Sequence, residues 1–431
     1  MKKLEKKRDF QFVTERVKDR PLNKRKLLRK TIITASMAVI FGLIACFTFL
    51  VLEPVFSSWL YPQEEMDMIE IPQDTDEVLP EDMLVHEESM LEQTEEVINS
   101  LKSEMQLDAS SYQELYQNVY ALTQELVPAM VTVTSVSQDI DWFNDPYENT
   151  GQTTGFLLTD NNREVMILVM YDELAAGEEL EVTFANGEQV TAAMEGMDEE
   201  TGLAVLAVKK ESLTDATLES IRYIELGRST GTQLMGTPVI ALGRPLGKQN
   251  SVVFGMVTSE DTVLSVTDAN YKLLTTDIYG STDATGLLIN MNGQVIGIIN
   301  QEHNSQTAPN LVSAMGITEL KPVLERMSNG LEKSYLGIKG ADVPDEITNS
   351  LKVPQGAYVT GIVMDSPAMA AGIQSGDVIV RMGDTQIHSF EAYTQAVRQL
   401  NPEQVVEIVV MRQGQQAYRM VNLKVTMGEL K

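Results

Sequence analysis

The sequence predicts a mainly β protein that is held at a membrane by a single transmembrane helix and ends in a small α+β module. Three observations carry this prediction: an uncharged apolar run near the N-terminus, a long series of short β-rich segments, and a last stretch with one helix among its strands. The chain has 431 residues, which allows two or three domains. Its apolar residues amount to 43%, enough to bury a sizeable core and to exclude wholesale disorder.

Charge is distributed unevenly along the chain. Residues 1–30 contain 13 Lys/Arg and 4 Asp/Glu, whereas the whole chain has a net charge of −29. The acidic part lacks the basic stripe that a nucleic-acid binder would show, so nucleic acid is excluded as a partner.

The run from Thr31 to Leu52 carries no charged residue. At about 1.5 Å per residue it extends for about 33 Å, enough to cross the hydrocarbon core of a bilayer. A cleaved signal peptide is the alternative, but the run and the basic tail are long for one, and no small-x-small site precedes Glu53. We therefore predict a basic cytoplasmic tail at 1–30 and a transmembrane helix at 31–53, with the rest outside by the positive-inside rule.

An acidic linker and an amphipathic helix are predicted for residues 54–127. Between Pro62 and Glu96 the chain has many Asp/Glu and no Lys/Arg, a block that repels itself and stays extended. It is either a spacer above an anionic surface or a solvated tail without a specific role. From about Glu88 to Leu126 the apolar spacing turns helical, with too few heptads for a coiled coil, so we expect a helix that packs on the next domain.

Short β-rich runs fill residues 128–325, separated by Gly, Asn, Asp and Pro. Because no long helices intervene, the pattern predicts an all-β barrel or sandwich. Asn292-Gly293 between two apolar runs is typical of a two-residue hairpin turn. A polar helical stretch then leads to the last module at 331–428, which contains a helix from Ser389 to Leu400. The single cysteine, Cys46, lies in the membrane run, so the exterior part has no thiol for a disulfide or a metal site.

Several segments of the β-rich region and the last module resemble one family. They are LEVTFANGEQVTAAMEGMDEETGLAVLAV from Leu180, GTPVIALGRPLGKQNSVVFGMVTS from Gly236, GLLINMNGQVIGI from Gly286 and SPAMAAGIQSGDVIVRMGDTQIHSF from Ser366. The chain resembles the HtrA/DegP-type serine proteases. This resemblance implies a trypsin-like double β-barrel at 128–325 and an α+β PDZ domain at 331–428.

The same resemblance implies a catalytic histidine, aspartate and serine, and the matching positions lack all three. In that family the serine attacks, the histidine takes its proton and the aspartate orients the histidine. Ungapped counting places Asp172 at the histidine position, Gly202 at the aspartate position and Ala284 at the serine position. Thr282 replaces a glycine of the oxyanion hole, and a β-branched residue resists positive φ. We therefore predict a degenerate member of the family, a pseudoprotease.

An active serine endopeptidase with displaced catalytic residues is the alternative. Of the three histidines, only His303 lies in the barrel region, where it would have to pair with Ser281 as a rebuilt dyad. Carboxylate pairs such as Asp172 with Asp283 are expected by chance in so acidic a chain. No calcium loop, phosphate-binding loop or zinc-protease motif is present, so the sequence predicts neither a metal nor a cofactor.

The PDZ-like module keeps the parts that bind peptides in this family. The resemblance implies that the Y-L-G-I loop offers backbone N–H groups to a terminal carboxylate, while the ligand adds as a strand beside it and a helix supplies a side-chain pocket. The alternative is that the apolar residues of that helix simply pack the core of the module. The predicted peptide-binding residues are Tyr335, Leu336, Gly337, Ile338, Phe390, Tyr393 and Val397.

Together these features predict a membrane-anchored, extracytoplasmic HtrA-like protein without proteolytic activity. It would bind unfolded or C-terminal peptide segments and act in envelope protein quality control or regulation. The resemblance also implies a homo-oligomer, a trimer in many members, or a mixed assembly with an active relative. A purely structural partner of a septal or wall complex is a third possibility. A single anchor and a cysteine-free exterior fit the surface of a monoderm bacterium.

Overall fold

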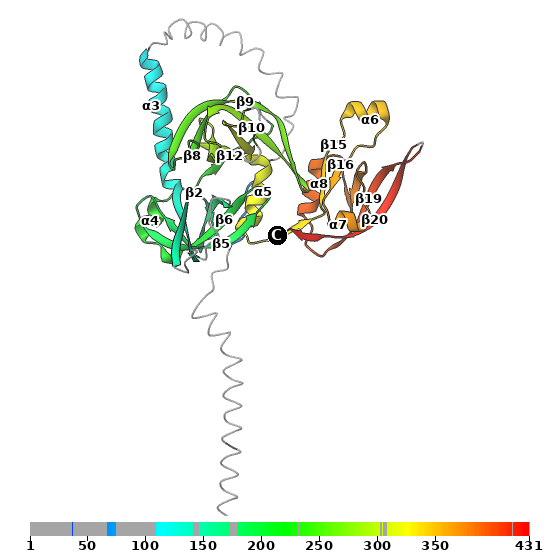
Figure 1. The fold of residues 1–431 in the computed structure, drawn as a ribbon, viewed down its shortest axis with the longest axis horizontal. Coiled ribbons are helices and arrows are strands. Elements are labelled where there is room, and N and C mark those ends of the chain that lie inside the picture. Colours follow the sequence, from blue (N-terminus) through cyan, green and yellow to red (C-terminus); the bar gives the residue numbers. More distant parts are fainter. Residues whose placement is uncertain are drawn as a thin grey trace, which may run out of the picture. The chain divides into compact units, whose positions relative to one another are not determined.

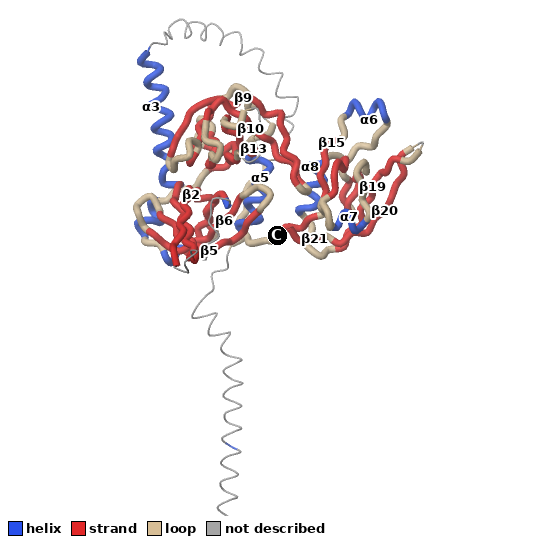
Figure 2. The backbone as a smooth tube through the Cα atoms, viewed as in Figure 1, coloured by secondary structure: helices blue, strands red, loops and turns tan. Residues whose placement is uncertain are grey.

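The computed structural model describes residues 67–74, 109–140, 146–171, 179–231, 233–301, 308–415 and 417–430, together with Met37 and Asn304 (Figures 1 and 2). The predicted transmembrane helix at 31–53, apart from Met37, lies outside these residues, as do Asp172 and His303. Within the described ranges, every helix is too short or too polar to span a bilayer.

Six antiparallel strands close the first barrel in the order β1-β2-β3-β6-β5-β4. They are β1 Met130–Ile140, β2 Pro146–Asp160, β3 Glu164–Met170, β4 Glu179–Thr183, β5 Gln189–Asp198 and β6 Leu203–Lys209. Strand β3 is apolar and buried on both faces. Side chains alternate along a strand, so its residues point in turn into two different cores. Its residues Val165, Ile167 and Val169 fill the barrel interior. Met166, Leu168 and Met170 face the larger core instead.

A second closed sheet follows, with the order β11-β8-β9-β10-β13-β12 and an additional β11–β12 pairing that completes the ring. Its strands are β8 Pro238–Arg244, β9 Ser251–Val266, β10 Ala269–Tyr279, β11 Thr285–Ile289, β12 Gln294–Asn300 and β13 Leu311–Gly316, and the short β7 Glu225–Leu226 pairs with β12 in parallel. Strand β8 shows the same alternation as β3, with Val239 and Ala241 inside the sheet and Ile240 and Leu242 in the larger core. The predicted mainly β fold with two barrels is confirmed.

The remaining elements of the barrel region are short or peripheral. They are α3 Ala109–Leu126, η2 Val127–Ala129, η4 Lys210–Ser212, α4 Asp215–Ser220 and α5 Ile317–Ser328. Helix α3 packs on the second barrel through Tyr116, whose ring lies edge-on to Phe254 with centroids 6.1 Å apart. Helix α5 buries Leu320, Val323 and Leu324 in the larger core.

Residues 67–74 do not behave as the free acidic linker that the sequence predicts for this region. Ile69 and Ile71 are buried in the larger core. The Ile69 N–H donates to Asn329 Oδ1 and the Ile69 carbonyl accepts from Asn329 Nδ2, both at 2.9 Å. The Ile71 N–H donates to Glu325 Oε2 at 3.1 Å. Two isoleucines within the acidic block therefore anchor this part of it along α5.

The Asn292-Gly293 turn differs from the two-residue hairpin that the sequence predicts. Strands β11 and β12 are joined by residues 290–293, and Asn290 N–H donates to the Gln294 carbonyl at 2.9 Å. The Asn290 side chain accepts hydrogen bonds from the N–H groups of Asn292 and Gln294. The Asn290 side chain therefore stabilises a loop that is longer than a two-residue turn. The preference of Asn-Gly for two-residue turns did not indicate this longer loop.

The last domain is α+β, as predicted. Its main sheet has the order β15-β16-β17-β19-β20, with β18 paired to β17. The elements are β14 Lys333–Tyr335, β15 Ile338–Asp342, α6 Asp345–Leu351, β16 Ala357–Ile362, α7 Pro367–Ala371, β17 Val378–Met382, β18 Thr385–Gln386, α8 Phe390–Arg398, β19 Val405–Gln413, β20 Tyr418–Thr426 and β21 Gly428–Leu430, which pairs with β14. Ser389 caps α8 by accepting a hydrogen bond from Ala392 N–H at 3.0 Å. Strand β15 is the edge of the sheet beside α8.

Candidate functional site

Ala284, at the predicted serine position, is fully buried at the end of a turn that precedes β11. The turn rests on β8, because strands β8 and β11 approach very closely here. A Cβ on Gly286 would lie 2.1 Å from the Leu242 carbonyl oxygen, so only glycine fits. The side chain that this geometry presents is a methyl group, which has no oxygen to act as a nucleophile.

The backbone around Ala284 is engaged in hydrogen bonds of its own. The Ala284 N–H donates to the Ser281 carbonyl at 3.2 Å, and the Ser281 N–H donates to the Pro245 carbonyl at 2.9 Å. Thr282 is not among the residues with positive φ. An oxyanion hole needs N–H groups aimed at the developing charge. In this conformation the Ala284 N–H points into the turn.

Ser281 is the hydroxyl that the alternative prediction would use as a nucleophile. Its Oγ donates to the Asp283 carboxylate, which also lies 3.0 Å from Arg244 Nη2. The Ser281 hydrogen bond and, to a smaller extent, the Arg244 charge hold the pKa of the Asp283 carboxyl below its usual value. A carboxylate with a lowered pKa is a weaker base toward the hydroxyl that donates to it. The one histidine among the described residues, His388, belongs to the last domain.

Gly202, at the predicted aspartate position, ends the turn between β5 and β6 with a φ of 67°. Its carbonyl accepts a hydrogen bond from Tyr171 N–H at 2.8 Å, so it lies beside the residue that precedes Asp172 in the chain. Asn300 links this position to the Ala284 turn. Its side chain donates to the Thr201 carbonyl at 3.3 Å, while its backbone pairs with Thr285. Asn300 therefore connects the two turns that hold Gly202 and Ala284, and neither of these residues carries a catalytic group.

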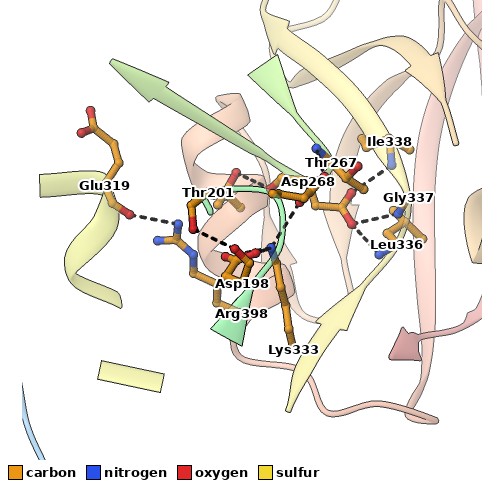
Figure 3. A network of polar contacts seen from close by, with 12 residues as sticks. Asp198, Thr201, Thr267, Asp268, Glu319, Lys333, Leu336, Gly337, Ile338 and Arg398 are labelled. Carbon is orange, nitrogen blue, oxygen red and sulfur yellow. Dashed lines mark hydrogen bonds and ion pairs between the residues drawn. The ribbon is translucent and has the colours of Figure 1, made fainter. Parts of the chain in front are cut away.

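The predicted carboxylate-binding loop lies between β14 and β15. Gly337 has a φ of 92°, and a Cβ there would lie 2.2 Å from Ser366 Cβ, so the loop requires glycine. This backbone turns three successive N–H groups toward one point (Figure 3). Leu336 and Gly337 donate to one oxygen of Asp268 at 2.7 and 2.8 Å, and Ile338 donates to the other at 3.0 Å. The loop thus binds a carboxylate, but this carboxylate belongs to the chain itself and not to the C-terminus of a peptide, which was the predicted ligand.

Asp268 lies at the tip of the β9–β10 hairpin. Val266 pairs with Ala269, so the turn has two residues, and Asp268 adopts a φ of 58° that Asp tolerates better than most residues. Its side chain is inserted between β15 and α8 and also accepts a hydrogen bond from the Tyr393 hydroxyl. Burial raises the pKa of the Asp268 carboxyl above its usual value, although the donated hydrogen bonds act in the opposite direction.

The other predicted peptide-binding residues are mostly inside the last domain. Phe390, Tyr393 and Val397 are buried in its core, and the rings of Phe390 and Tyr393 have centroids 5.2 Å apart. The side chains of Leu336 and Ile338 are buried in the same core, so these two residues reach the carboxylate only through their backbone. The structure thus gathers the N–H groups of Leu336, Gly337 and Ile338 and the Tyr393 hydroxyl around one point. Phe390 and Val397 are buried in the core of the domain.

Asp268 is the site residue that sequence reasoning missed. The segment VTDANY, between two apolar runs, does indicate a turn. Its partners, however, lie 68 to 70 residues further along the chain. No local pattern indicates where the tip of a hairpin docks.

A group of charged residues holds the two domains together beside this contact (Figure 3). Lys333 Nζ lies 3.2 Å from both Asp198 and Glu200. Burial lowers the pKa of Lys333, but the charges of these carboxylates outweigh it and the pKa is raised. Glu200 Oε1 also accepts a hydrogen bond from Thr267 N–H at 2.9 Å, next to Asp268. The hairpin tip is therefore fixed by the barrels as well as by the last domain.

Comparison with known proteins agrees with both parts of this architecture. The family profile for the trypsin-like peptidase domain matches residues 153–298, and the profile for the PDZ domain matches residues 334–425. The chain is similar to serine proteases of the HtrA and DegP type. It is 27% identical over 311 residues to the serine protease Do-like HtrA of Lactococcus lactis subsp. cremoris, which covers 67% of this chain and 74% of that protein. It is 24% identical over 329 residues to the protein of the same name from Bacillus subtilis, covering 70% of this chain and 72% of the relative.

A similar fold is found among solved structures. A variant of the HtrA-type protease AlgW, solved with a tripeptide, superposes with a TM-score of 0.50 at 22% identity over 72% of this chain and 96% of that one. At this identity the match concerns the fold. The predicted trypsin-like fold followed by a PDZ domain is thus confirmed for this HtrA/DegP-like chain.

Proposed function

We propose that this HtrA-like chain binds peptides with a free C-terminus through its PDZ domain and does not hydrolyse them. The observation that supports the absence of hydrolysis is the residue at position 284, an alanine. A buried methyl group stands at the proposed nucleophile position, and the adjacent N–H is used inside the turn. Acyl transfer needs a nucleophile, a base and a stabilised oxyanion, and the loss of a single triad member already removes orders of magnitude in rate.

Three features support peptide binding. Three N–H groups converge on a carboxylate at the PDZ loop, strand β15 is a sheet edge beside a helix, and the similar AlgW structure was solved with a tripeptide. An extended peptide can add to such an edge through main-chain hydrogen bonds. Unfolded segments and exposed C-termini have this chemistry, so the proposed role is protein quality control or regulation in the cell envelope.

The apolar run at 31–53 and the basic tail before it support a membrane anchor with the domains outside the cytoplasm. We propose that the protein is single-pass, with the N-terminus in the cytoplasm. Self-assembly, or assembly with an active relative, belongs to the same proposal.

Two measurements on the full-length protein in detergent test the lack of proteolysis. We expect no cleavage of casein and no labelling by a fluorophosphonate probe. Ser281→Ala is the matched control, because Ser281 is the hydroxyl of the alternative dyad. Labelling of the wild type that disappears in Ser281→Ala would instead support an active protease with displaced residues.

Peptide binding is tested separately, by fluorescence anisotropy of a labelled decapeptide with an apolar free C-terminus. The same peptide with an amidated C-terminus is the control, since it lacks the charged carboxylate. Saturable binding of the free acid, and not of the amide, is expected. Equal binding of both peptides would contradict recognition at the loop.

A further inference from the structure

We propose that the Asp268 side chain is an internal ligand of the PDZ peptide site, which a peptide carboxylate must displace by making the tip of the β9–β10 hairpin withdraw. This inference rests on the proposed function, because it takes the loop from Leu336 to Ile338 as the place where peptide carboxylates bind.

The first argument is the identity of the bound group. A side-chain carboxylate and a C-terminal carboxylate present the same two oxygens to the loop. Asp268 uses the N–H groups of Leu336, Gly337 and Ile338, and each N–H has a single hydrogen to donate. A peptide carboxylate therefore finds no unused donor in these three groups while Asp268 is bound, and it would also meet a like charge.

The second argument is that the hairpin tip also uses the backbone of the sheet edge. Asp268 N–H donates to the Ile338 carbonyl at 2.8 Å, and Asn270 Nδ2 donates to the Gly340 carbonyl at 3.1 Å. These carbonyls belong to β15, the edge strand to which a peptide would add. The tip thus takes the place of the last residues of a peptide strand, and not only of its carboxylate.

The third argument is the depth of the contact. Asp268 is 4% exposed, and Thr394 on α8 donates to its backbone carbonyl at 3.0 Å, so contacts from β15 and α8 enclose it on two sides. An occupant on the same chain is always present at a high effective concentration. The apparent affinity for a peptide is then reduced by the fraction of molecules in which the site is open.

The occupant belongs to the trypsin-like domain. Strand β9 pairs with β8, and β8 pairs with β11, the strand that follows the Ala284 turn. Peptide binding would therefore break a contact between the two domains, which connects occupancy of the PDZ domain to the barrel that holds the degenerate site.

The experiment compares the wild type with Asp268→Ala and Asp268→Asn in the full-length protein. Asp268→Asn keeps the size of the side chain and removes its charge. It is the second test variant, to be used if Asp268→Ala folds poorly. The matched control is Asp261→Ala, which removes an exposed carboxylate from β9 of the same hairpin. Circular dichroism spectra establish that each variant keeps its strand content.

Hydrogen exchange without peptide gives the first readout. If Asp268 protects the loop, the amides of Leu336, Gly337 and Ile338 exchange at least about tenfold faster in the Asp268 variants than in the wild type or Asp261→Ala. Unchanged protection in both Asp268 variants would overturn the proposal.

Anisotropy with the labelled decapeptide gives the second readout. The Asp268 variants are expected to bind the free-acid peptide about tenfold more tightly than the wild type and Asp261→Ala do. Equal affinity of the wild type and both Asp268 variants would refute the internal ligand and leave the proposed peptide-binding function intact. Absence of binding by every variant would refute the peptide-binding function itself, and the internal-ligand proposal with it.

Discussion

The Lys321 ammonium lies 2.7 Å from the Asp74 carboxylate, and the two side chains are only 5% and 9% exposed. Asp74 also accepts a hydrogen bond from Thr318 Oγ1 at 2.6 Å. This pair joins the docked segment at 67–74 to helix α5, across 247 residues of sequence. It makes the segment part of the folded unit and gives the first prediction.

Asp74→Ala should destabilise the protein strongly. Removal of one partner leaves the Lys321 charge buried without compensation, which costs about 3–5 kcal/mol. The exposed Glu70→Ala in the same segment is the control and should change stability by less than about 0.5 kcal/mol. Urea unfolding followed by tryptophan fluorescence or circular dichroism measures both. Equal stability of the two variants would mean that the segment is not held by this pair.

Asp160 should contribute to the acid sensitivity of the fold. Burial raises its pKa, but hydrogen bonds from Lys210 and Tyr223 outweigh burial and leave the pKa below its usual value. Lys210 Nζ and Tyr223 Oη both lie 2.6 Å from the carboxylate. A lowered pKa in the folded state gives stability that is present above the unfolded pKa of about 4 and is lost as the pH falls below it.

The test is urea unfolding of the wild type and Asp160→Asn between pH 6 and pH 3. The difference in unfolding free energy should be largest at pH 6 and should shrink as the pH falls below about 4. A difference that stays constant with pH would show that Asp160 acts through packing and not through its charge.

Gly337→Ala should damage the PDZ loop more than an ordinary glycine substitution at positive φ. Positive φ alone costs about 1–2 kcal/mol, and the clash with Ser366 adds to it, for a total of at least about 2 kcal/mol. Gly372→Ala separates the two effects, because Gly372 has a similar φ of 82° and no heavy atom within 4 Å of the added Cβ. Thermal or urea unfolding of both variants gives the comparison. Equal losses would show that the loop relaxes around the new methyl group.

Ala284→Ser should fail to create a protease. The Ala284 side chain is buried in the interior of the second barrel, so a new hydroxyl would face apolar residues, and the N–H of residue 284 would still be engaged by the Ser281 carbonyl. We expect casein cleavage and fluorophosphonate labelling to stay at the level of the wild type, with Ser281→Ala as the matched background. Activity gained by this single change would imply that a base and an oxyanion hole already exist at the site.

The barrels and the last domain could be predicted from the sequence because their signals are local. Apolar runs such as the one in β3 alternate between two cores, and Ser389 followed by the spaced apolar residues of α8 indicates a capped helix. The alanine at position 284, which matches the serine of the similar proteases, can also be read directly from the residues. These features depend on neighbours within one strand, turn or helix.

The docking contacts could not be predicted in the same way. Ile69 binds Asn329 across 260 residues, and Asp268 binds a loop near residue 337. Each involves residue types that are common in linkers and turns, and for the first of them composition alone predicted an extended acidic linker. The partner of a polar side chain is decided by which surfaces the completed fold brings together, and such contacts leave no periodic pattern in the chain.

The position of the hairpin tip on β15 also bears on how copies of this protein avoid sticking to one another. A strand at the edge of a sheet presents unpaired N–H and C=O groups on which a second molecule can add a strand, a common start of aggregation. Here the carbonyls of Ile338 and Gly340 are already bonded to Asp268 and Asn270. If a peptide takes the place of the tip, one strand-like segment replaces another, and this part of the edge stays covered in either state.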